Sequence, residues 1–297
     1  MARGDVEYGI GGYMAPPPPL RRPWFPWLVP SIFVGTIALF VYSLYVNNCP
    51  EVTGAYRCVF YPSLGRFSFQ PLTENPLLGP STATLKKLGA LNLKLVQDGE
   101  KWRLLACVFL HAGVIHLLAN MLTLLFIGIR MEREFGFLRI GVLYVLSGVG
   151  GSIASCFYNA DSKSLSVGAS GALFGLLGAM LSELITNWTI YAKKCAALVS
   201  LVLVICVSMA IGFLPHVDGS SHSGGFASGF LLGFILLVRP QFGYVSQKCV
   251  HPGYEMNKTK SKYKCYQYFL WITAFVLFII GYVISLFILF HTKLPNN

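Results

Sequence analysis

The sequence has few charged residues. Of its 297 residues only 12% are Asp, Glu, Lys or Arg, which is about half the usual share of a water-soluble domain. Apolar residues make up 55%, and the mean hydropathy is +0.61. So few charges cannot cover the surface of a soluble globule, and so apolar a chain is not a disordered one. The composition indicates a membrane protein.

Several chemical motifs are also missing. The eight cysteines form no CxxC pair, there is no HExxH, and the apolar runs contain no pair of aspartates. These absences argue against a zinc site and against a two-aspartate protease. A nucleic-acid surface would need basic residues clustered on one folded face, whereas here they lie between apolar runs, which argues against a nucleic-acid partner. We therefore expect no metal or other cofactor and no nucleic acid.

Seven apolar runs have roughly the length, about 20 residues, that a helix needs to cross a bilayer. Backbone groups in lipid must pair within their own segment, so these runs are expected to be helices. The fourth and sixth are rich in glycine and begin with polar residues. The runs are Trp27–Val46, Leu104–Ile129, Phe137–Tyr158, Ser164–Ile185, Cys195–Leu214, Ser221–Val238 and Tyr268–Phe290.

The basic residues favour one orientation of these runs. Short connections rich in Lys and Arg face the cytosol. With a cytosolic N-terminus, the cytosolic connections hold Arg3, Arg21, Arg22, Arg130, Arg133, Arg139, Lys193, Lys194, Arg239, Lys248, Lys258, Lys260, Lys262 and Lys264, and the short outer ones hold only Lys163 and Lys293. The first run then acts as a signal anchor. We expect a multi-pass protein of the secretory pathway (Golgi, another endomembrane or the plasma membrane) with a lumenal or extracellular C-terminus.

This topology divides the chain into five parts. They are a cytosolic tail (1–23), a six-span core (24–240) with a long first loop (47–101), a basic cytosolic loop (241–267), a seventh span (268–290) and a short tail (291–297). In the first loop, Ser81–Asn92 has leucines at helical spacing, which predicts a helix lying in the membrane interface. Cys49 and Cys58 of that loop could form a disulfide in an oxidising compartment.

Polar side chains gather near the starts of the second, fourth and sixth runs. These runs cross the membrane in the same direction, so their polar segments are expected at similar depth. Polar groups inside a membrane are costly and often functional. The segments contain His111, His116 and Asn120; Gly168, Ser170 and Gly171; and His222, Gly225 and Gly229.

Taken together, these residues allow acyl-transfer chemistry. A neutral imidazole at His222 could remove the proton of the Ser170 hydroxyl. His116, Asn120 and the N–H of Ser170 could stabilise the developing oxyanion. Taken singly, each has a simpler explanation, since intramembrane serines bond to their own helix and polar side chains join neighbouring helices.

The spacing of small residues suggests how the two catalytic candidates could meet. Gly225 and Gly229 share a helix face with His222, and small residues at this spacing let helix backbones approach closely. Phe174, four residues after Ser170, could stack on the imidazole. Asp218 is the only acidic residue near these groups, and we predict a Ser–His dyad without an acid.

This joint pattern resembles the rhomboid family of intramembrane serine proteases over about 102–240. The matching pieces are Trp102-Arg103, His111…His116…Asn120, Glu132…Gly136, Gly168-Ala-Ser170-Gly171 and His222…Gly225…Gly229. Ser221 and Ser223 depart from it, because members often have alanine before this histidine and an apolar residue after it. The stretch Leu64–Pro80 and the residues around Glu132–Phe137 look like plant members.

The resemblance implies an all-α polytopic fold, with a rhomboid-like six-helix core and one additional C-terminal transmembrane helix. It assigns Ser170 as nucleophile, His222 as base, and His116 and Asn120 to the oxyanion. The implied reaction cleaves single-pass transmembrane proteins in or near their membrane segment. A catalytically weak or inactive relative that binds membrane clients for trafficking or quality control is the alternative. A transporter with a histidine relay would require an internal repeat, and the sequence shows none.

Overall fold

The computed structural model describes residues 23–158, 165–212, 217–240 and 263–292. This part of the chain is helical and contains two isolated β-bridges but no strand. The N-terminal tail up to residue 22, most of the basic loop (241–262) and the tail from residue 293 lie outside it. So do the serine that begins the fourth run and the end of the fifth run. The chain has the all-α polytopic fold that the sequence predicts.

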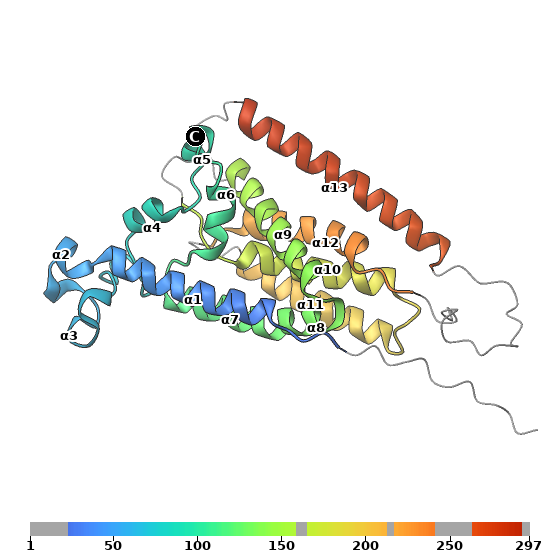
Figure 1. Ribbon diagram of the computed structural model, residues 1–297, viewed down its shortest axis with the longest axis horizontal. Coiled ribbons are helices and arrows are strands. Elements are labelled where there is room, and N and C mark those ends of the chain that lie inside the picture. The colour runs from blue at the N-terminus through green and yellow to red at the C-terminus, as the bar shows by residue number, and fades with distance from the viewer. Residues whose placement is uncertain (1–22, 159–164, 213–216, 241–262, 293–297) are drawn as a thin grey trace, which may run out of the picture.

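The principal helices follow the apolar runs (Figure 1). They are α1 (Leu28–Asn47), α7 (Val114–Thr123), the π-helical turn η4 (Leu124–Gly128), α8 (Ile129–Phe135), α9 (Phe137–Tyr158), α10 (Ser170–Thr186), α11 (Lys194–Ile211), α12 (Gly219–Leu236) and α13 (Cys265–His291). Short helices build the first loop: α2 (Cys49–Thr53), η1 (Ala55–Arg57), α3 (Tyr61–Leu64), η2 (Gly65–Phe67), α4 (Thr82–Leu88), α5 (Leu93–Gln97), α6 (Arg103–Ala106) and η3 (Cys107–Phe109).

Four helical stretches of the described chain are long and apolar enough to cross a membrane. They are Leu28–Thr53, Val114–Phe135, Phe137–Tyr158 and Cys265–His291. The helices α10 and α11 are apolar but shorter, and α12 opens with a polar turn, GSSHS. That all seven runs cross the bilayer stays a prediction.

The second helix starts later than the apolar run predicts. The run begins at Leu104, but α7 begins at Val114. The preceding residues form α6 and η3, and the chain is extended at Gly113. There the backbone pairs with the first loop, since the N–H groups of Val114 and Ile115 donate to the carbonyls of Leu78 and Leu77. Hydropathy alone cannot distinguish this buried loop from the start of a span.

Three helices, α9, α10 and α12, pack tightly in the centre of the molecule (Figure 1). Most side chains of α10 are buried, whereas none of the described side chains of α11 is. Glycines allow the close approach. A methyl group at Gly225 would overlap the carbonyl of Gly171, and one at Gly229 would overlap that of Gly175. Small residues at four-residue spacing thus bring the backbones of α10 and α12 into contact.

The N-terminus of α1 is held by an acidic side chain from another helix. The buried carboxylate of Glu132 in α8 accepts hydrogen bonds of 2.8–2.9 Å from the N–H groups of Trp27, Leu28 and Val29. The first N–H groups of a helix have no partner within it, and an anion there also favours the helix dipole. The Glu132…Gly136 motif therefore has a structural role.

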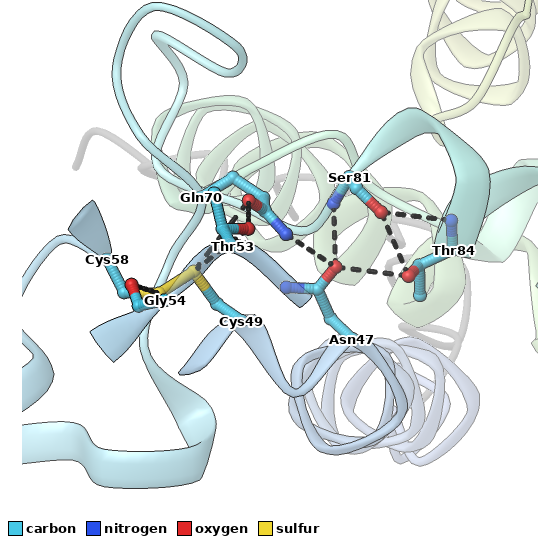
Figure 2. The surroundings of a disulfide bond; sticks show 8 residues. All are labelled: Asn47, Cys49, Thr53, Gly54, Cys58, Gln70, Ser81 and Thr84. Carbon is cyan, nitrogen blue, oxygen red and sulfur yellow. Dashed lines mark hydrogen bonds between the residues drawn. A yellow bond between two sulfur atoms is a disulfide. The ribbon is translucent and has the colours of Figure 1, made fainter. Parts of the chain in front are cut away.

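A disulfide closes the start of the first loop, and a buried amide joins the loop to the end of α1. The predicted disulfide between Cys49 and Cys58 is present. Figure 2 shows the Asn47 side-chain oxygen beside it, accepting from the Gln70 side chain, the Ser81 N–H and the Thr84 hydroxyl. The predicted interfacial helix is α4, capped at its start by Ser81. Its position in a membrane interface stays a prediction.

The C-terminal helix α13 lies along α9 and α12 (Figure 1) and is held by polar contacts at three levels. At its start, the Gln267 amide donates to the Thr186 and Arg239 carbonyls. In its middle, the Tyr282 hydroxyl donates to the Leu146 carbonyl of α9. At its end, Gln97 of the first loop donates to the carbonyl of Leu289. The additional helix is thus an integral part of the fold.

Candidate active site

Ser170 is the first residue of α10 and is half-buried. The first N–H groups of an α-helix have no partner inside the helix and carry partial positive charge. The preceding segment is fixed, because the N–H of Gly168 donates to the carbonyl of Cys107 at 2.9 Å. The Ser170 hydroxyl therefore sits beside backbone donors that an anion could use.

His222 lies in the first turn of α12 and is 5% exposed. Its ring stacks on Phe174 of α10, with centroids 4.2 Å apart and an angle of 18° between the planes. Its Nδ1 has no hydrogen-bond partner among the described residues and faces the turn at Gly212, where a methyl group would come within 3.1 Å. The stack fixes the imidazole on the face of α10 that begins with Ser170.

The serines beside His222 have different surroundings. The hydroxyl of Ser221 would lie 2.8 Å from a methyl group placed on Gly171 and 2.9 Å from one on Gly151. It therefore fills the space where α9, α10 and α12 meet. Ser223 is exposed, and its hydroxyl donates to the Gly219 carbonyl of its own helix. Of the two serines that depart from the family pattern, Ser221 is thus packed between helices and Ser223 faces outward.

His116 and Asn120 share one face of α7, as their four-residue spacing predicts. The Asn120 amide donates to the backbone carbonyl of His116 at 3.0 Å, which leaves its second N–H for another acceptor. The His116 ring lies against Gly168, where a methyl group would be 2.6 Å from Cε1. Gly168 also has φ +130°, a value that favours glycine. His116 and His222 are close enough to interact electrostatically.

The sequence predicts His111 within the second helix, and this prediction is wrong. His111 precedes α7 in the extended stretch before Gly113, not within the second helix. Its side chain is 1% exposed, and neither ring nitrogen has a hydrogen-bond partner among the described residues. Its ring centroid lies 5.2 Å from that of His116. His111 is therefore a buried side chain that packs against the ring of His116.

The first-loop pair Trp102-Arg103 has a structural role. The buried Arg103 guanidinium donates to the carbonyls of Lys86 and Ala90 at 2.7 and 2.9 Å, and it pairs with Glu100. The Trp102 ring lies against Gly89, whose φ of +117° ends α4. These contacts hold the first loop together at the end of α4.

Asp218 is more closely connected to this region than the sequence suggests. It caps α12, and its carboxylate accepts from the Ser155 and Ser220 hydroxyls and from the Ser221 N–H. Burial alone would raise the pKa of the Asp218 carboxyl, but these hydrogen bonds and one from Ser166 hold that pKa below its usual value. The sequence does contain a signal for this role, because an aspartate four residues before His222 can act as the N-cap of the helix that carries it.

The described residues contain no group of three or more His, Cys, Asp or Glu side chains that could hold a metal ion. The arrangement instead brings one serine, one buried imidazole and several donors to neighbouring helix ends. Such a set is typical of acyl transfer.

Comparison with known proteins agrees with this pattern. A family model for the rhomboid domain matches residues 98–239. RHOMBOID-like protein 5 of Arabidopsis thaliana is 53% identical over 94% of this chain and 90% of its own length. The chain belongs to the rhomboid family. RHOMBOID-like protein 1 of the same plant is 59% identical to this rhomboid protein over 90% of the chain and 67% of its own length.

Two further relatives differ in what their names say of activity. Rhomboid protease GluP of Bacillus subtilis is 37% identical over 50% of this rhomboid chain and 29% of its own length. Inactive RHOMBOID-like protein 8 of Arabidopsis thaliana is 46% identical over 72% of the chain and 60% of its own length. Family membership therefore establishes the fold, and the function depends on the site.

Proposed function

We propose that this rhomboid protein is an intramembrane serine endopeptidase that uses Ser170 as nucleophile and His222 as general base and acid. The observation that carries the proposal is the stack of His222 on Phe174 in α10, four residues after Ser170. The contact between the Gly171 carbonyl and Gly225 supports it, because it keeps α10 and α12 together at this level.

The first half of the reaction forms an acyl-enzyme. The Ser170 oxygen attacks the carbonyl carbon of the scissile peptide bond, and His222 takes the hydroxyl proton. The negative charge on the carbonyl oxygen is stabilised by the N–H of Ser170, the His116 ring and the second N–H of Asn120. When the tetrahedral intermediate collapses, the C–N bond breaks, and His222 gives its proton to the leaving amine.

The second half releases the product. His222 removes a proton from a water molecule, which attacks the ester carbonyl, and the proton then returns to the Ser170 oxygen. Water must reach this site because lipid cannot supply it. The 17 residues of α10 span about 25 Å, less than the roughly 30 Å of a bilayer core. The short length of α10 is therefore an argument for a site that lies below the membrane surface and opens to water.

The substrates are expected to be single-pass transmembrane proteins. A peptide bond within a helix is shielded by its backbone hydrogen bonds, so the scissile segment must first leave the helix. Substrates with small or helix-destabilising residues near the outer end of their span fit this requirement.

We infer that the N-terminus is cytosolic and that the protein resides in the secretory pathway. The Cys49–Cys58 disulfide supports this placement, because disulfides persist in oxidising compartments. Membranes alkylated before lysis and run on non-reducing gels test it. We expect Cys49 and Cys58 to be protected as a disulfide, and two free thiols at these positions would contradict the placement.

The decisive experiment is reconstitution with a tagged single-pass reporter. We expect the wild type to yield two fragments, and Ser170→Ala and His222→Ala to lower product formation by at least about 1,000-fold. The matched controls are Ser200→Ala and His291→Ala, since both residues are exposed and neither belongs to the proposed site. Mutants of Ser170 and His222 that cut as well as the wild type would overturn the assignment.

The alternative is an inactive relative that binds membrane clients, as the similarity to an inactive RHOMBOID-like protein permits. In that case the wild type would bind the reporter without cutting it, and Ser170→Ala would retain the cellular effect of the protein. The presence of both a serine and a histidine at the candidate positions favours the protease.

A further inference from the structure

Asp218 fixes the helix turn that carries His222. It is the N-cap of α12, and its carboxylate accepts from the Ser221 N–H at 3.0 Å and from the Ser220 hydroxyl at 2.6 Å. Its backbone carbonyl accepts from the His222 N–H at 3.3 Å. An acidic N-cap satisfies N–H groups that have no partner within the helix. The position of His222 thus depends on this cap.

The same carboxylate joins α12 to two other segments near Ser170. The Ser155 hydroxyl, near the end of α9, donates to its second oxygen. The Ser166 hydroxyl, four residues before Ser170, also donates to the carboxylate. Ser166 in turn pairs with Leu91 of the first loop through two backbone hydrogen bonds of 2.9 and 3.1 Å. The Asp218 side chain therefore holds the segment that precedes α10 in place relative to α12.

The carboxylate is also a charge near the imidazole. Because its donors hold the pKa of Asp218 below the usual value, it is anionic at neutral pH. Asp218 and His222 interact electrostatically. Among the described residues, the other titratable groups that interact with the pair lie on three elements. His116 on α7 interacts with His222, and the buried thiols of Cys107 on η3 and Cys156 on α9 interact with Asp218. A nearby negative charge favours a protonated imidazole.

This arrangement differs from a catalytic triad. In a triad the acid accepts a hydrogen bond from the Nδ1–H of the histidine. Here the His222 Nδ1 has no hydrogen-bond partner among the described residues. The carboxylate acts on the imidazole through the helix turn and through its charge.

We propose that Asp218 is a positioning residue that aims His222 at Ser170 and stabilises the imidazolium formed when His222 takes the serine proton. The inference rests on the proposed protease function. The carboxylate is proposed to act through the helix cap and through its charge, so the test must separate these two roles.

The test compares the pH dependence of kcat/KM for the reporter in the wild type and in Asp218→Asn. Asparagine is nearly isosteric and also caps helices well, so this variant removes the charge and keeps the cap. The acid limb of kcat/KM reports the free base. We expect it to move to lower pH by about 0.5–1 unit, because loss of the negative charge disfavours the imidazolium. The plateau should fall by about 3- to 30-fold.

Ser155→Ala is the matched control, since it removes one neutral donor and keeps the charge. Its acid limb is expected to stay within about 0.2 unit of the wild type. Asp218→Ser, a second neutral N-cap, replaces Asp218→Asn if that variant does not fold. An acid limb that remains in place in the neutral variant overturns the proposal, whatever the plateau rate.

The outcomes distinguish this inference from the proposed function. If the wild type yields no more product than Ser170→Ala, the proposed function itself is wrong. If the wild type cuts the reporter and the neutral variants match its profile, only the role of Asp218 is wrong.

Discussion

The imidazole of His222 lies parallel to the ring of Phe174, with 4.2 Å between the centroids. The two residues come from different helices, α12 and α10, and the contact is made where glycines let the helix backbones touch. A stack of this kind restricts rotation of the imidazole. A base that must first receive a proton from Ser170 and then return it depends on such a fixed orientation.

Phe174→Leu should weaken catalysis. Aromatic contacts of this type are worth about 0.5–1.5 kcal/mol, and a loosely held His222 lowers kcat. We expect kcat to fall by about 3- to 10-fold, measured with the reconstituted reporter. The control is Phe275→Leu, on the exposed face of α13. Equal rates for Phe174→Leu and the control would show that the stack does not orient the base.

Gly168→Ala should impair the oxyanion site. The new Cβ would lie 2.6 Å from Cε1 of His116, and φ is +130° at this position, where a side chain costs about 1–3 kcal/mol. Displacement of His116 and of the loop before Ser170 should lower kcat by at least about tenfold. Gly35→Ala is the control, because nothing lies within 4 Å of that site. The prediction fails if Gly168→Ala retains wild-type kcat.

Gly229→Ala should destabilise the protein. A methyl group there would overlap the carbonyl of Gly175, so α10 and α12 would have to separate at a cost of about 1–3 kcal/mol. Thermal unfolding in detergent measures this as a lower Tm. Gly281→Ala on α13 meets nothing within 4 Å and should be neutral or slightly stabilising. Similar Tm values for both variants would argue against close packing at Gly229.

Glu132→Gln should loosen the start of α1. One amide oxygen cannot replace two carboxylate oxygens that accept three N–H groups, and the amide N–H₂ would face a donor. Leaving a buried donor unpaired costs about 1–3 kcal/mol, again measured as a lower Tm. The control is Glu74→Gln, an exposed residue of the first loop. If the two variants unfold together, the carboxylate does not hold α1.

Much of the helical structure could be predicted from the sequence, because the length and composition of an apolar run are local properties. Apolar runs predicted α1, α9 and α13 to within three residues at either end. The pattern failed at residues 104–113, where an apolar segment forms α6, η3 and an extended stretch. That outcome depends on backbone pairing with Leu77 and Leu78, about 35 residues away, and hydropathy does not register such pairing.

The sequence by itself determined the chemistry available to this protein: a serine in a GxSG motif, a histidine with two glycines on its helix face, and a His–Asn pair one turn apart. Only the tertiary structure decided how these groups are supported. The stack on Phe174, the fit of His116 against Gly168 and the gathering of Ser155 and Ser166 around Asp218 each join residues from separate segments. Side chains far apart in the chain meet only when helices pack, so no local pattern specifies these contacts.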